Sequence, residues 1–174
     1  MFKRILLITS ITLFTLSCDK NLPDGHYQNA LNLISENNYA AAIIELRNAV
    51  KSTPSIAKYR LELSKAYIHQ KQFLSAEKEL KKALELGQPL HEVLPYLAII
   101  LNKNNKLVEL SELNLNSPQL SPEEKAKIGF FKTKALTALK EDKKANDVIN
   151  KIALLETTSL YKAMTSSFID IIAH

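Results

Sequence analysis

The feature that most constrains the fold of this chain is a repeat with a period of about 34 residues. An aromatic residue, an alanine, a leucine and a second alanine recur at the paired positions Tyr39/Phe73, Ala42/Ala76, Leu46/Leu80 and Ala49/Ala83. The two members of every pair have the same separation along the chain. A fixed period of this length is typical of a solenoid, in which each unit buries its apolar face against the next unit.

The residues inside the repeat predict a helix that packs closely on another. Ala42, Leu46 and Ala49 are spaced i, i+4 and i+7, so they lie on one helix face. The alanines allow two helices to approach each other, and the leucine fills the space between them. Pro54 follows and stops the helix, because it lacks an amide proton and restricts the residue before it.

The period continues along the chain with one irregular unit. The first helix of the second pair has a large, a small and an aromatic residue at Leu63, Ser64 and Tyr67. In the third pair, Leu110 stands where a small residue is expected and Asn114 where a large one is expected. We therefore predict that the second helix of this pair, at about 106–113, is short.

A fourth pair follows two prolines that interrupt the chain. Ser121 and Pro122 are followed by two glutamates, a pattern that favours a helix start at this point. The predicted helices span about 122–139 and 142–155. A last apolar helix begins at Leu160, and it either folds back over the fourth pair or continues a longer array. The predicted pairs cover about 26–54, 57–88, 91–116 and 122–156, with a partial pair at 160–174.

These repeats resemble the tetratricopeptide (TPR) family, and more closely one group within it. Segments 39–49 and 76–87 resemble the opening repeats of the TPR-repeat lipoprotein of the PEP-CTERM/exosortase system, and 91–98 resembles its next helix. The resemblance covers about Cys18 to Leu113. It implies an all-α solenoid of antiparallel helix pairs that forms a right-handed superhelix. It also implies a periplasmic scaffold linked to protein sorting and exopolysaccharide export, although members of the group are longer and carry more repeats.

The N-terminal segment predicts export. Lys3 and Arg4 precede an apolar run from Ile5 to Leu16, which is shorter than the ~20 residues that span a bilayer. Residues 1–17 are therefore a predicted signal peptide. Leu16, Ser17 and Cys18 resemble the lipobox of bacterial lipoproteins, in which the cysteine is acylated, although Thr15 stands where leucine is usual. A simple signal peptide that is cut elsewhere is the alternative.

A lipid anchor would place the protein at the bacterial cell envelope, facing the periplasm. Acyl chains contribute about 0.8 kcal/mol per buried CH2, so two or three of them anchor a protein stably. In enterobacterial lipoproteins an aspartate after the cysteine favours retention in the inner membrane, and Asp19 occupies that place. Residues 18–25 are rich in turn-forming residues and are predicted to be a tether.

Composition points away from catalysis, metal or cofactor binding and nucleic-acid binding. Without Lys3 and Arg4 the chain has 21 basic and 18 acidic residues, interleaved as on a solvated helix face. Only Gly25, Gly87 and Gly129 are present, so there is no glycine-rich phosphate loop. The four histidines are scattered without metal-binding spacing. Gly129 and the phenylalanines after it are predicted to pack in the core.

The predicted function is binding of a protein or peptide along the concave face, which the first helix of each pair lines in TPR arrays. By repeat register, the positions on this face are Lys58, Leu61, Lys65, Ile68, His69, Glu92, Tyr96, Ile99 and Lys103. Their mixture of apolar and basic groups favours a segment with acidic character. The clamp with which chaperone-binding TPRs hold a terminal carboxylate is absent, because Tyr27 and Leu31 occupy its first-repeat positions.

Two other functions remain open at this stage. Short TPR lipoproteins also serve pilus assembly and outer-membrane protein insertion, and the length of this chain suits them. The chain is alternatively a truncated accessory domain of a larger enzyme, whose catalytic part would lie beyond His174.

Overall fold

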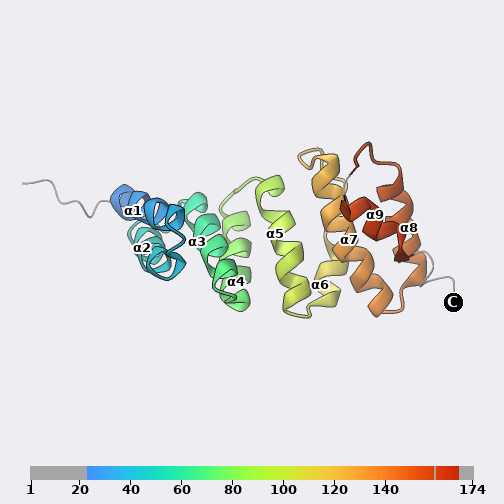
Figure 1. The fold of residues 1–174 in the computed structure, drawn as a ribbon, viewed down its shortest axis with the longest axis horizontal. Helices are drawn as coiled ribbons and strands as arrows, with labels where there is room; N and C mark the ends of the chain where they lie inside the picture. Colours follow the sequence, from blue (N-terminus) through green and yellow to red (C-terminus); the bar gives the residue numbers. More distant parts are fainter. Residues whose placement is uncertain (1–22, 159, 169–174) are drawn as a thin grey trace, which may run out of the picture.

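The protein is an elongated stack of helices (Figure 1). The computed structural model describes residues 23–158 and 160–168. Within these residues the chain forms α1 (Pro23–Ser35), α2 (Tyr39–Ser52), α3 (Ala57–His69), α4 (Phe73–Glu85), α5 (Leu90–Lys103), α6 (Leu107–Glu112), α7 (Pro122–Ala138), α8 (Asp142–Ala153) and α9 (Leu160–Ser166). Short turns join α1 to α2, α3 to α4, α5 to α6 and α7 to α8, which makes each of these an antiparallel pair. The predicted all-α solenoid is thus confirmed.

The element boundaries follow the predicted pairs closely, with one shift at the N-terminal end. Helix α1 begins at Pro23, so the last residues of the predicted 18–25 tether are helical. The predicted signal peptide at 1–17, the predicted lipidation site at Cys18, Asp19 and the end of the predicted partial pair at 169–174 lie outside the described residues. None of the helices in the described ranges is long and apolar enough to cross a membrane.

The turn inside each pair repeats the same backbone conformation. A residue with positive φ follows the first helix at Asn37, Lys71, Asn105 and Lys140, once in every repeat. At each turn the next amide donates to a carbonyl near the end of the first helix, as Gln72 N does to Tyr67 O at 2.9 Å. This arrangement is the Schellman motif, which satisfies carbonyls left unpaired at a helix end. The irregular third pair makes the turn at Asn105, so it keeps the register of its neighbours.

Close approach between helices depends on small residues at one position. Ala42, Ala76 and Ala145 are each fully buried where the second helix meets the first. Leu110 is also fully buried at this position, but its side chain is larger. Helix α6 packs less extensively on its own partner α5 than on α7. The larger residue therefore accounts for the weak packing within the third pair, whose second helix α6 ends at Glu112.

The core is continuous from one pair to the next. One buried cluster joins the first two pairs through Ile43, Leu46 and Leu63, and a larger cluster runs from α3 to α8. Tyr67 of α3 packs against both clusters. Burial of a leucine side chain stabilises the folded state by about 1.5–3 kcal/mol. Leu46 of the first pair is buried in the same cluster as Leu63 of the second pair, so the two pairs stabilise each other.

The fourth pair is built as predicted at its start and is closely packed at its centre. Ser121 and Glu124 form a reciprocal capping box, in which each side chain bonds the backbone amide of the other residue. Gly129 lies against α8, where a Cβ atom would approach Ile152 Cδ1 to 2.4 Å. Phe130 contacts Phe131, Tyr161 and Phe168, which brings α9 against α7. The predicted packing role of this glycine–phenylalanine segment is confirmed.

A buried carboxylate joins the second and third pairs. Glu77 of α4 is 4% exposed. It accepts hydrogen bonds from Lys106 Nζ at 2.6 Å and Asn104 Nδ2 at 2.7 Å, and Lys81 Nζ lies 2.8 Å away. Burial opposes ionisation, but the bonds from Lys106, Lys81 and Asn104 outweigh it and lower the pKa of the Glu77 carboxyl. Glu77 therefore ties the turn before α6 to the preceding repeat as a charged group.

Replacing Lys71 by glycine is expected to stabilise the protein. A left-handed backbone costs an L-residue about 1–2 kcal/mol, and the greater freedom of glycine when unfolded offsets part of the gain. We expect Lys71→Gly to raise the free energy of unfolding by about 0.5–1 kcal/mol in urea titrations followed by circular dichroism. The control Lys143→Gly, on the exposed surface of α8, should lower it by about 1 kcal/mol. A loss of stability in Lys71→Gly would contradict the left-handed turn.

Replacing Glu77 by glutamine is expected to destabilise the protein in a pH-dependent way. Loss of charge-assisted hydrogen bonds should lower the free energy of unfolding by about 1.5–3 kcal/mol at neutral pH. Because the pKa of Glu77 is lowered in the folded chain, its contribution is complete above the ordinary glutamate pKa. It is lost as pH falls through the lowered value. Urea titrations from pH 7 to pH 3 should show the two proteins converging.

The control for this variant is Glu85→Gln, since Glu85 forms an exposed ion pair with Lys82. It should change stability by less than about 1 kcal/mol. A constant difference between Glu77→Gln and the wild type across the pH range would show that the carboxylate charge is not what stabilises the junction.

Candidate binding face

The surface formed by the first helices, α1, α3, α5, α7 and α9, carries lysines and tyrosines in alternation. We call this surface the first-helix face. Lys58 Nζ lies 5.3 Å from the ring centroid of Tyr27, and Lys65 Nζ lies 5.7 Å from that of Tyr96. Lys127 Nζ lies 5.8 Å from the ring centroids of both Tyr96 and Tyr161. The contacts of Lys65 and Lys127 connect four successive first helices, from α3 to α9, in one row.

Each contact in the row is a cation–π interaction. An exposed contact between a lysine and an aromatic ring within about 6 Å is favourable by about 0.5–1 kcal/mol, because the face of the ring carries a negative partial charge. Lys65 and Lys127 are half-buried and Lys58 is exposed, as expected for long side chains that lie along apolar surface. The row therefore presents ordered cations beside aromatic rings.

A hollow of about 410 Å³ lies over the central part of this row. Its walls come from all three central first helices and from α9, the lining residues being Lys65, His91, Glu92, Pro95, Tyr96, Glu123, Glu124, Lys127 and Tyr161. Helix α5 contributes Pro95 and Tyr96 to the lining, together with His91 and Glu92. The hollow thus combines apolar rings with charges of both signs.

The charged groups of the hollow are held by neighbouring residues. Lys65 Nζ donates to Glu62 Oε1 at 2.9 Å. Burial favours the neutral amine, but the bond and charge of Glu62 outweigh it, and the pKa of Lys65 is raised. Glu92 accepts a bond from Gln88 Nε2 at 3.0 Å. Lys65 is therefore a permanent cation with its carboxylate partner on its own helix.

The structure brings three of the nine predicted binding residues together in this hollow, namely Lys65, Glu92 and Tyr96. Lys58 lies further along the first-helix face, against Tyr27. Ile99 is half-buried and Lys103 is exposed on α5. Ile68 is half-buried and packs against the core. None of these last four residues lines the hollow.

Two predicted residues have other places in the fold. Leu61 is 1% exposed and belongs to the main core cluster, so its assignment to the binding face is corrected. Its position in the repeat faces the neighbouring helices rather than solvent. His69 is exposed, but its ring stacks on Tyr39 of α2, with centroids 3.9 Å apart. It therefore packs at the junction of the first two pairs.

Two central residues of the row were missing from the sequence prediction. Lys127 lies about one repeat after Glu92, and Tyr161 lies one repeat after Lys127. Extending the register of Lys58 and Glu92 through the irregular third pair would have identified both. The number of residues per repeat changes slightly at the third pair, so the shared register of these positions was not recognised from the sequence.

The side chains of this face are of the kinds that can contact a peptide. Aromatic rings, lysine ammonium groups and carboxylates can hold the backbone and side chains of an extended peptide. In the part of the chain that the structure describes, no group of three or more histidine, cysteine, aspartate and glutamate side chains could hold a metal ion.

Comparison with solved structures supports the fold assignment. YrrB, described as "a TPR protein with an unusual peptide-binding site", matches with a TM-score of 0.62 and 16% identity, over 87% of this chain and 80% of its own. PilF of Pseudomonas aeruginosa matches with a TM-score of 0.60 and 19% identity, over 87% of this chain and 75% of its own. The fold is that of a TPR solenoid. No model of a known protein family and no curated protein sequence matches the chain.

Proposed function

We propose that this protein is a scaffold that binds an extended segment of a partner protein on its first-helix face. The observation that carries the proposal is the row of lysine–tyrosine contacts from Lys65 to Tyr161, which spans the hollow across four helices. A site built across several repeats can contact successive residues of an extended chain. The solved structure of YrrB supports this reading, since that TPR protein is described as having a peptide-binding site.

The proposed setting is the periplasmic side of a bacterial membrane. Acylation of Cys18 would tether the scaffold, with Asp19 favouring the inner membrane. The resemblance of segments 39–49 and 76–87 to the PEP-CTERM/exosortase lipoprotein supports a role in exopolysaccharide-linked protein sorting. The alternatives are roles in pilus assembly and in outer-membrane protein insertion. Identification of the bound partner would distinguish them from protein sorting.

Charge reversal in the row is expected to weaken partner capture strongly. A photocrosslinking residue in place of His91, which lines the hollow, should capture a partner in cells. Lys65→Glu with Lys127→Glu should reduce capture by about tenfold or more, because the two introduced carboxylates would repel an acidic segment. The matched control, Lys143→Glu with Lys151→Glu on α8, should leave capture unchanged.

Mass spectrometry of the captured partner tests the finer proposal. Components of protein sorting or polysaccharide export would support it, whereas pilus or β-barrel assembly proteins would favour the alternatives. Equal capture by both double variants, with unchanged circular dichroism, would contradict binding on the first-helix face.

Removal of the proposed lipidation site is expected to release the protein from the membrane. Cell fractionation should find the wild type in the inner-membrane fraction and Cys18→Ser in a soluble or unprocessed form, because the acyl chains supply the anchor. Asn21→Ser serves as the control and should remain with the membrane. Membrane association of Cys18→Ser equal to that of the wild type would exclude the lipid tether.

A further inference from the structure

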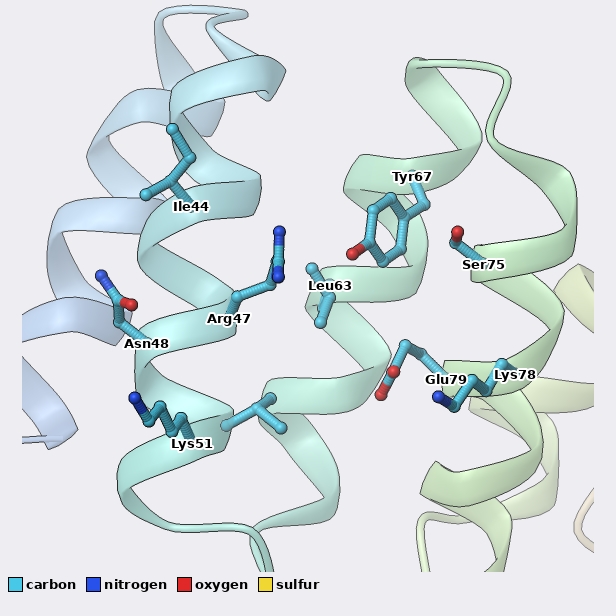
Figure 2. Close-up of a pocket in the computed structure, with 10 residues that line it drawn as sticks. Ile44, Arg47, Asn48, Lys51, Leu63, Tyr67, Ser75, Lys78 and Glu79 are labelled. Atoms are coloured by element: carbon cyan, nitrogen blue, oxygen red, sulfur yellow. The ribbon is translucent and has the colours of Figure 1, made fainter.

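A second and larger hollow lies between the second helices α2 and α4. It has a volume of about 660 Å³, and α3 forms its floor with Leu63 and Tyr67 (Figure 2). We call it the second-helix groove. Its lining residues are Ile44, Arg47, Asn48, Val50, Lys51, Leu63, Tyr67, Ser75, Lys78 and Glu79. None of them lines the hollow of the first-helix face.

The groove carries an excess of positive charge. Arg47 and Lys51 come from α2, and Lys78 comes from α4. Within the described residues, none of these three cations has an ion-pair partner. The groove has one carboxylate in its lining, Glu79, and Arg60 Nη1 binds it at 2.8 Å. Three uncompensated cations therefore surround one space.

The next repeat shows how the same position is neutralised inside the protein. Lys81 lies one repeat after Arg47 and so occupies the equivalent position on α4. Its ammonium group binds the carboxylate of Glu77 on its own helix and that of Glu109 on the following second helix. An ion-pair network thus joins α4 to α6 where α2 and α4 have an open groove.

The first two pairs lack both of those carboxylates. One repeat earlier, the residue equivalent to Glu77 is Ile43, and the residue equivalent to Glu109 is Ser75. Ile43 is buried, and Ser75 lines the groove. The cation of the repeat is kept as Arg47, while its partners are absent from the equivalent positions.

We propose that the second-helix groove binds an extended acidic segment of a partner protein, whose carboxylates take the place of the missing ones beside Arg47. Charge complementarity supports this occupant, because an arginine binds a carboxylate through two parallel hydrogen bonds. Figure 2 shows the Arg47 side chain extending from α2 toward Leu63 and Tyr67, across the groove. A ligand carboxylate near Ser75 would bridge α2 and α4 as Glu109 bridges α6 to α4.

The remaining lining favours a peptide over a small anion. Asn48, Ser75 and Tyr67 offer polar side-chain groups that have no hydrogen-bond partner among the described residues. Burial raises the pKa of Tyr67 more than the charge of Arg47 lowers it, so the hydroxyl keeps its proton and can donate. Val50 and Leu63 add apolar surface, and Ile44 is 60% exposed at the rim. A peptide whose apolar and acidic side chains alternate would match this lining.

The test supplies the missing carboxylate from the protein itself. Ser75→Glu places an acid at the position equivalent to Glu109, where it should bind Arg47 and close the groove. Glutamate is compatible with this position, since Ser75 lies in the first turn of α4 and a helix N-terminus favours negative charge. Ser75→Gln has the same length without the charge and is the matched control.

Binding is measured by fluorescence anisotropy with the full-length chain in detergent and a labelled peptide of alternating glutamate and valine. Wild type and Ser75→Gln should bind this peptide within about twofold of each other. Ser75→Glu and Arg47→Gln should bind it about tenfold more weakly or worse, because each removes a charge-assisted hydrogen bond from the complex. The interaction should also weaken as salt is added.

Three results would overturn the proposal. The first is equal binding of the glutamate–valine peptide by Ser75→Glu and Ser75→Gln. The second is equal binding of a glutamine–valine peptide by the wild type. The third is binding of dextran sulfate without binding of the acidic peptide. Lys65→Glu with Lys127→Glu should retain binding of the acidic peptide, so a failure of the first-helix face and a failure of this groove are distinguishable.

Discussion

The close approach of the two helices within a pair is the contact on which the rest of this structure depends. Ala42, Ala76 and Ala145 make it possible in three of the pairs, since a side chain of one carbon lets the helix axes come together. Where Leu110 replaces the alanine, α6 relies on α7 more than on its own partner α5. Once a pair is closed, its remaining apolar face is buried only by the next pair. The solenoid and its continuous core follow from this arrangement.

The charge balance of the surfaces is set repeat by repeat on this common backbone. The buried network of Glu77 with Lys106 joins α4 of the second pair to the turn that precedes α6 in the third pair. The same network neutralises Lys81, while Arg47 at the equivalent position has no ion-pair partner among the described residues. On the first-helix face, lysines lie against tyrosines and near carboxylates. A repeat protein can therefore carry distinct binding surfaces by changing single residues in register.

The sequence by itself determined the helical class, the four pairs and the positions of their turns. The fixed repeat period and the i, i+4, i+7 spacing within each repeat depend on local geometry that the repeats share. It also placed Lys65, Glu92 and Tyr96 on one face. Leu61 was misplaced because its position in the repeat says which helix face it occupies but not how closely the next repeat covers it.

Only the tertiary structure decided which charges meet. The contacts of Lys127 with Tyr96 and Tyr161, and the pairing of Lys81 with Glu109, join residues from different repeats. Their distances depend on how successive pairs pack against each other, which the spacing within one repeat does not specify. The second-helix groove follows from the same cause, because an unmatched cation becomes visible only when all neighbouring helices are in place. Local periodicity thus specified the units, and packing between the units specified their surfaces.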